Sequence, residues 1–144
     1  MRVEIRIREE CDQPRVIIET REMTEEVNAI VRFLEAPRRI AGFRDGVVEA
    51  LEPDEIIRVY AMEGKVLAVT ERGEYALRQR LYEVEERLDA SRFVRISNSE
   101  IINLRKARSF DLSLTGTVCV RMVNGDVTYA SRRYVGKIKK MLGI

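Results

Sequence analysis

A run of small polar side chains, Ser-Asn-Ser-Glu, interrupts two apolar stretches at residues 97–100, and Arg95 stands just before it. Asn and Ser are turn formers because their side chains hydrogen-bond their own backbone. The same groups also recognise nucleic acids, since an Asn amide can pair with an adenine edge and an Arg guanidinium with guanine or a phosphate. These residue types in this order therefore fit either a simple turn or a nucleic-acid contact.

Few residues elsewhere in the chain fit a catalytic site. The sequence has no histidine, which removes Ser-His and Cys-His nucleophilic sites and the commonest general base. It contains no phosphate-binding loop and no dinucleotide glycine pattern. The adjacent acids Glu85 and Glu86 would face different sides of a helix, and Cys11 and Cys119 lack the spacing of metal ligands. We therefore expect no enzyme activity, no cofactor, no metal site and no small-molecule substrate.

The charges are unevenly divided along the chain of 144 residues. Residues 1–89 contain 15 Lys and Arg against 21 Asp and Glu, a net charge of −6, whereas residues 90–144 contain 11 against 3, a net charge of +8. A positive field of this kind attracts phosphates, and the acidic remainder limits unspecific binding. The alternative is a solvated basic face with no partner.

The first 39 residues predict a small strand-strand-helix element. Apolar and charged residues alternate over residues 3–7, and residues 15–20 have a similar pattern, as expected of half-buried strands. A helix is then predicted from Thr24, a possible N-cap, to Pro37, which would stop it. The apolar face of this helix consists of Val27, Ile30, Val31 and Leu34. We expect this element to contribute to dimerisation and the rest of the chain to form a separate domain.

From residue 40 the sequence predicts mainly short strands. Apolar runs at residues 47–51, 56–60 and 65–70 are separated by turn-forming pairs such as Asp45-Gly46 and Glu63-Gly64. An amphipathic helix is predicted next, over residues 76–88. Its apolar positions are Leu77, Leu81, Val84 and Leu88. The pattern is that of hairpins with a helix packed against them.

A further hairpin is predicted around Asn124-Gly125, because such a pair supplies the positive φ that a type I′ turn requires. Pairing outward from that turn puts Met122 opposite Val127 and Val120 opposite Tyr129. All four side chains would then share one apolar face.

The chain closes with a predicted short basic helix. Ser131 is its possible N-cap, and apolar residues recur behind it at helical spacing. These apolar residues are Val135, Ile138 and Leu142. Three lysines lie off that face: Lys137, Lys139 and Lys140.

The stretches FVRISNSEIINLRKARSF and VNGDVTYASRRYVGKIKKML together resemble the LytTR family of DNA-binding domains. The shared parts are an F-x-R strand, a polar run, an I/V-x-N-L strand, an N-G hairpin and an S-R-x-Y helix start. The upstream stretch EIIRVYAMEGKVLAVTERGEYALRQRLYEVEERL is also similar, so the resemblance covers residues 40–144. It implies a mainly β (α+β) fold of antiparallel sheets with short flanking helices. It also implies a sequence-specific bacterial transcription regulator that inserts loop side chains into successive major grooves of DNA.

The resemblance places DNA contacts at the loop around Gly64, at the polar run and at the arginines that follow the last strand. The expected DNA-binding residues are Lys65, Arg95, Ser97, Asn98, Arg132, Arg133 and Lys137. The sequence leaves open which of the two adjacent arginines reaches a base. Many members of the family carry histidine at the position of Ser97, so their base preference does not transfer to this chain.

The expected partners are double-stranded DNA, a second copy of the chain in a homodimer, and a small membrane protein that restrains the regulator. No receiver domain is expected before the DNA-binding domain, and no apolar run has the length of a membrane span, so a cytoplasmic location is expected. The alternative function is an RNA-binding or protein-interaction β module. RNA binding would need exposed aromatic residues, and the predicted hairpin places Tyr129 on an apolar face.

Overall fold

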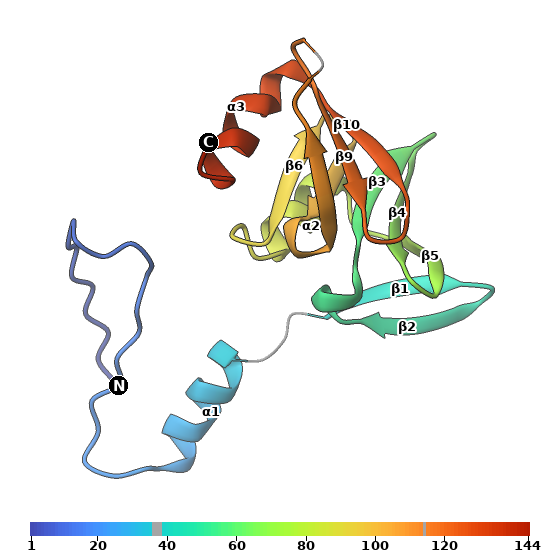
Figure 1. Cartoon of the computed structure of the whole chain (residues 1–144). Coiled ribbons are helices and arrows are strands. Elements are labelled where there is room, and N and C mark those ends of the chain that lie inside the picture. Colours follow the sequence, from blue (N-terminus) through green and yellow to red (C-terminus); the bar gives the residue numbers. More distant parts are fainter. Residues whose placement is uncertain (36–38, 114) are drawn as a thin grey trace. The chain divides into compact units, whose positions relative to one another are not determined.

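The computed structural model describes residues 1–35, 39–113 and 115–144. The chain divides into two compact units, Met1–Ala36 and Pro37–Ile144, and Figure 1 shows it coloured from the N-terminus in blue to the C-terminus in red. Within the described ranges, no helix is long and apolar enough to cross a membrane.

The first unit contains the helix α1, Glu25–Glu35. Its N-terminus is capped as expected, because the backbone N–H of Val27 donates to the Thr24 hydroxyl at 3.2 Å. Val27 is also the buried residue of the apolar face, whereas Leu34 is half exposed. The predicted helix is therefore confirmed, and its predicted stop at Pro37 lies outside the described residues.

The two strands predicted before α1 are wrong, because residues 1–24 contain no strand. Five branched side chains of these segments are 66% to 94% exposed, and Ile18 is partly buried. The five are Val3, Ile5, Ile7, Val16 and Ile17. A pair of short strands is at best marginally stable without a further sheet or helix to cover its apolar face. An alternating pattern alone was therefore not sufficient to form them.

The second unit contains a seven-stranded antiparallel sheet in the order β2-β1-β5-β4-β3-β7-β6. Its strands are β1 (Ile40–Arg44), β2 (Val47–Leu51), β3 (Arg58–Met62), β4 (Lys65–Thr70), β5 (Gly73–Leu77), β6 (Phe93–Ser97) and β7 (Glu100–Asn103). Short turns join β1 to β2 and β3 to β4, and the first of these is the predicted Asp45-Gly46 pair with φ of 51° and 76°. The predicted bounds of β2 and β4 are confirmed.

A second, three-stranded antiparallel sheet has the order β10-β9-β8. It comprises β8 (Ala107–Asp111), β9 (Val118–Met122) and β10 (Val127–Ala130). Two short 3₁₀ helices, Pro53–Glu55 and Leu104–Lys106, precede β3 and β8. The remaining helices are α2 (Leu81–Arg87) and α3 (Arg132–Met141), and α3 packs against β6 (Figure 1).

The helix α2 begins five residues later than predicted, because Ala76 and Leu77 end the strand β5. Leu77 nevertheless packs in the same buried cluster as Leu81 and Val84 of the helix. The apolar spacing that predicted one long helix therefore spans the end of a strand and the start of a shorter helix. Both elements turn their apolar side chains to the same core.

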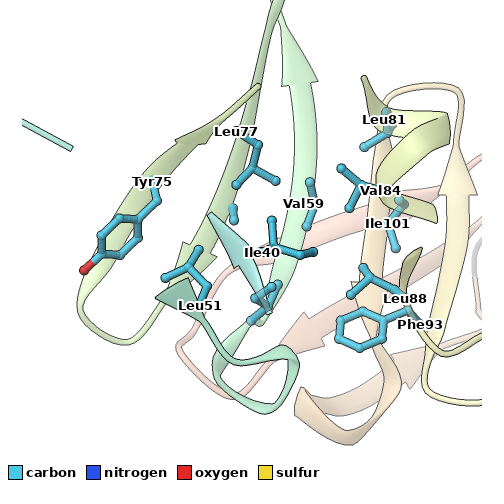
Figure 2. Packing of buried hydrophobic residues seen from close by; sticks show 12 residues of the cluster. Ile40, Leu51, Val59, Tyr75, Leu77, Leu81, Val84, Leu88, Phe93 and Ile101 are labelled. Carbon is cyan, nitrogen blue, oxygen red and sulfur yellow. The ribbon is translucent and has the colours of Figure 1, made fainter. Parts of the chain in front are cut away.

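The paired strands β6 and β7 separate two cores, since successive side chains of a strand point to opposite faces. Ile101 packs with Val84 of α2 and with Leu88, which directly follows that helix, in the cluster that Figure 2 shows. Its neighbour Ile102 packs in the other cluster, with residues of the second sheet and with Ile138 of α3. Both faces of these strands are thus covered, and the loop that joins them extends from the end of two buried strands.

The register of the β9–β10 hairpin differs from the prediction by one residue. Val127 pairs with Arg121, and Thr128 pairs with Val120. The turn is three residues long, with a hydrogen bond from Gly125 N to the carbonyl oxygen of Met122 (3.0 Å) and φ of 92° at Gly125. This is a type I turn followed by a bulge rather than a two-residue type I′ turn.

A shift of one residue turns every side chain of a strand to its other face. Thr128 and Ala130 of β10 are therefore buried, whereas Val127 is 45% and Tyr129 is 57% exposed. The predicted apolar face is correct for β9 and wrong for β10. The expectation that Tyr129 is buried, on which the case against RNA binding partly rested, is wrong as well.

Candidate nucleic-acid interface

A tight loop at residues 97–99 joins β6 to β7, and the side chain of Arg95 organises its backbone. The guanidinium donates from Nε to the carbonyl oxygen of Ser97 (2.7 Å) and from Nη2 to that of Asn98 (2.6 Å). Its Nη1 also lies 3.3 Å from the Glu85 carboxylate on α2. The Ser97 hydroxyl accepts a hydrogen bond from the backbone N–H of Ser99 at 3.2 Å. The turn expected from the Ser and Asn side chains is therefore present.

Asn98 is the exposed residue in the middle of this loop. Its Oδ1 accepts a hydrogen bond from the Tyr134 hydroxyl of α3 at 3.4 Å. Within the described residues its amide nitrogen makes no hydrogen bond. Two N–H donors of Asn98 are thus available to an acceptor outside the protein.

The first turn of α3 lies beside the loop. The backbone N–H of Ser131 donates to the carbonyl oxygen of Ile96 at 2.8 Å, which fixes the start of the helix against the end of β6. Arg132 and Arg133 follow directly, and both are exposed. Two adjacent exposed arginines therefore begin the helix whose start is bonded to the end of β6.

The two arginines have different neighbours. The Arg132 guanidinium lies against Gly116, where a Cβ atom would come within 2.6 Å of Nε. The Arg133 guanidinium lies 5.5 Å from the centre of the Tyr134 ring. Because Tyr134 also contacts Asn98, Arg133 is the one joined to the loop through a shared neighbour.

The turn between β3 and β4 reaches the same end of the sheet. Glu63 and Gly64 have φ of 51° and 78°, as in a type I′ turn, and Lys65 behind them is exposed. The backbone N–H of Ala61 donates to the carbonyl oxygen of Ser99 at 2.8 Å. This bond ties the β3–β4 hairpin, and with it Lys65, to the 97–99 loop.

Lys137 extends the basic surface along α3. It stands four residues after Arg133, and residues at this spacing lie on the same side of a helix. Lys137, Lys139 and Lys140 are all exposed, whereas Ile138 is fully buried against the second core. The structure thus places all the predicted DNA-binding residues on the loop and the end of β6, at the β3–β4 turn and on α3.

A charged network that the sequence patterns did not reveal lies next to the loop. Arg58 donates from Nε to Asp126 at 2.9 Å, and its Nη1 lies 3.5 Å from the Glu100 carboxylate. Burial raises the pKa of Glu100, and the charge of Arg58 opposes this rise. The network joins β3, β7 and the β9–β10 hairpin, and so fixes the strand that leaves the loop.

One signal in the sequence pointed to this network. Residues 90–144 contain only three acids, and two of them, Glu100 and Asp126, are partners of Arg58. An isolated acid in a basic region needs a cation nearby when it is buried. The identity of that cation, far away in the sequence, could not be read from the pattern.

Asn103, the asparagine of the I/V-x-N-L motif, is fully buried. Its Nδ2 donates to the carbonyl oxygen of Ile56 (2.9 Å), and its Oδ1 accepts from the backbone N–H of Arg105 (3.0 Å). Both halves of the amide are therefore occupied inside the protein. This part of the motif is structural.

Comparison with known proteins identifies the architecture. The family model of the LytTr DNA-binding domain matches residues 47–143. The chain belongs to the LytTR family. The resemblance noted from the sequence motifs is thus confirmed, and the matched region contains the loop, the β3–β4 turn and α3.

Relatives of the LytTR chain occur in Staphylococcus aureus. An uncharacterized HTH-type transcriptional regulator of strain NCTC 8325 is 31% identical over 118 residues, which cover 82% of this chain and 79% of the relative. A protein with the same description from strain MRSA252 is 30% identical over the same length.

The fold agrees with a solved LytTR structure. A LytTr DNA-binding domain from Bacillus cereus superposes with a TM-score of 0.71, covering 74% of this chain and 97% of that domain. The two sequences are 20% identical, so this match concerns the fold alone. The predicted class of antiparallel β-sheets with short helices is confirmed.

Proposed function

We propose that this LytTR protein is a sequence-specific transcription regulator that binds duplex DNA through the 97–99 loop, the β3–β4 turn and the first turn of α3. The observation that carries the proposal is the set of hydrogen bonds that joins these three segments. Ser99 is bonded to β3, Ser131 is bonded to β6, and Tyr134 reaches Asn98. Exposed polar and basic groups are thereby held in fixed relative positions at one end of the sheet.

The proposed roles follow from the chemistry of the side chains. Asn98 presents free amide donors and can pair with a base edge, preferably adenine. Arg133 can bond guanine O6 and N7 with its planar fork. Lys65, Ser97, Arg132 and Lys137 suit phosphate oxygens, which position the protein without reading sequence.

Exposed apolar side chains in the first unit support a homodimer. The helix α1 leaves Phe33 82% and Leu34 50% exposed, although an apolar helix face is normally covered by another element. We propose that this face packs against the same face of a second copy of the chain. We also propose that the protein acts in the cytoplasm. Sedimentation of the full chain and of a chain beginning at Arg39 tests the proposed dimer, and a truncated chain that dimerises as strongly as the full chain would refute it.

DNA binding is tested by titrating a preferred duplex, selected from a random library, and a scrambled duplex over a range of salt concentrations. We expect affinity to fall steeply with salt for both duplexes, because cations of the protein displace counterions from phosphates. We also expect the preferred duplex to bind at least about a thousandfold more tightly. Equal affinity for the two duplexes would contradict sequence-specific recognition.

A further inference from the structure

We propose that Arg95 is a positioning residue for DNA recognition, which shapes the 97–99 loop and does not itself touch DNA. This inference rests on the proposed function of the loop. It assigns Arg95 a different role from the direct contact that the sequence pattern predicts. It also assigns a role to Glu85, on a helix that carries none of the proposed contacts.

The guanidinium of Arg95 is already engaged within the protein. Nε and Nη2 donate to two successive carbonyl oxygens of the loop at 2.7 and 2.6 Å, and Nη1 lies 3.3 Å from Glu85. The Arg95 side chain is only 16% exposed. To bind DNA it would have to leave these partners, and the carbonyl oxygens of Ser97 and Asn98 would then be without their charged donor.

Strand alternation explains why Arg95 points inward. Phe93 packs in the core that contains α2, whereas Val94 and Ile96 pack in the other core. Arg95 is two residues from Phe93 and therefore lies on the α2 side of β6. The guanidinium is thus held between the helix and the loop.

The geometry requires arginine rather than any cation. Arginine has a planar fork of donors that can serve two neighbouring carbonyl oxygens and a carboxylate at once. Lysine has the same charge on a single nitrogen and cannot reproduce this arrangement. Replacing Arg95 by Lys therefore keeps the positive charge and removes the planar set of donors that bonds two carbonyl oxygens and a carboxylate.

Glu85 holds the guanidinium from the opposite side. Its neighbour Glu86 is exposed and makes no hydrogen bond with Arg95. Glu85→Gln and Glu86→Gln are therefore a matched pair, with the same chemical change and the same change of net charge. Of the two, only Glu85→Gln weakens the contact that holds the Arg95 guanidinium against the loop.

The first measurement concerns the full chain without DNA. Amide hydrogen exchange, followed by NMR, reports the opening of the loop through the N–H of Ser99, which is bonded to the Ser97 hydroxyl. We expect exchange of Ser99 to accelerate about tenfold or more in Arg95→Lys and by a smaller factor in Glu85→Gln. Unchanged exchange in Arg95→Lys would overturn the proposal.

The second measurement concerns DNA. In Arg95→Lys the affinity for the preferred duplex is expected to fall about tenfold or more, and the affinity for a scrambled duplex much less. The slope of log affinity against log salt should stay that of the wild type, because the protein still neutralises the same phosphates. Glu85→Gln should show the same selective weakening to a smaller extent, and Glu86→Gln should match the wild type.

The outcomes separate the possible roles of Arg95. A flatter salt slope in Arg95→Gln would mean that Arg95 binds a phosphate. Relaxed preference at a single base pair, with unchanged exchange of Ser99, would mean that it reads a base; either result overturns the proposal. If the wild-type chain prefers no duplex, the proposed function fails, while the exchange rates of Ser99 still decide whether Arg95 shapes the loop.

Discussion

Asn98 and Asn103 are side chains of the same type in one short motif, and the structure holds them differently. Asn98 is exposed in a loop, whereas both ends of the Asn103 amide are bonded to the backbone, at Ile56 and Arg105. The motif identified both residues. Their roles depend on Ile56 and Tyr134, which are distant in sequence and could not be inferred from the motif.

Alanine substitutions at these two positions should therefore have opposite effects. Asn98→Ala should cost about 1–3 kcal/mol of binding to the preferred duplex and little stability, because it removes one base contact. Asn103→Ala should cost about 1–3 kcal/mol of folding stability, because it removes the partner of the buried carbonyl oxygen of Ile56 and that of the backbone N–H of Arg105. Thermal unfolding and duplex titration of both variants check this. A large drop in the melting temperature of Asn98→Ala would mean that Asn98 serves only the turn.

The buried carboxyl of Glu100 makes stability depend on pH. Burial raises its pKa in the folded protein, so the folded state binds the proton of Glu100 more tightly than the unfolded state does. The contribution of this group to stability is therefore greatest below the ordinary pKa of Glu, about 4.3, and disappears as the pH rises through the raised value. Glutamine at this position cannot titrate.

The free energy of unfolding of Glu100→Gln, relative to that of the wild type, should consequently increase as the pH rises from about 4 towards neutrality. Denaturant titrations at several pH values measure this difference. If the difference instead decreases with rising pH, the attraction of Arg58 outweighs the cost of burying the Glu100 carboxylate.

At the scale of elements, the strands flanked by clear turn pairs were predicted best. The bounds of β2 and β4 follow from Asp45-Gly46 and Glu63-Gly64, whose positive φ values fix the hairpins. Asn124-Gly125 is compatible with both a two-residue and a three-residue loop. The burial of Thr128 and Ala130 distinguishes the two registers, and this burial is not visible in the sequence.

Two glycines offer a matched test of the β9–β10 turn and of α3. Gly125 has φ of 92°, whereas Gly136 has ordinary helical geometry and open space around its Cα atom. Gly125→Ala should destabilise the protein by about 1–2 kcal/mol, because a Cβ atom is disfavoured in the left-handed region. Gly136→Ala should stabilise it by about 0.5–1 kcal/mol, since glycine is a poor helix former. Equal effects of the two substitutions on the free energy of unfolding, measured by denaturant titration, would contradict the bulged turn.

At the scale of the whole molecule, the charge division is the feature that the sequence shows most directly. The basic residues lie in the part of the chain that contains the loop and α3, and the net charge of residues 90–144 is +8. The role of residues 1–24 could not be predicted in the same way. Their alternating pattern is typical of strands, which need a covering partner, and residues 1–24 form no strand.

Substitution of the three exposed lysines of α3 distinguishes phosphate contacts, which position the protein on DNA, from base contacts, which read its sequence. Replacing Lys137, Lys139 and Lys140 by Gln should weaken binding to preferred and scrambled duplexes by similar factors. The slope of log affinity against log salt should become flatter by about 0.9 for each phosphate that the variant no longer neutralises. Titrations at several salt concentrations give this slope. An unchanged slope would confine the DNA contacts to the loops and the start of the helix.

The central claim is that Asn98 and the neighbouring segments read a DNA sequence, and library selection tests it most directly. Wild type and Asn98→Ala are used side by side to select duplexes from a random pool, and the enriched sequences are compared. We predict that the wild type enriches a defined motif and that Asn98→Ala enriches the same motif with one position relaxed. The absence of any enriched motif for the wild type, or an identical motif for both proteins, would contradict this claim.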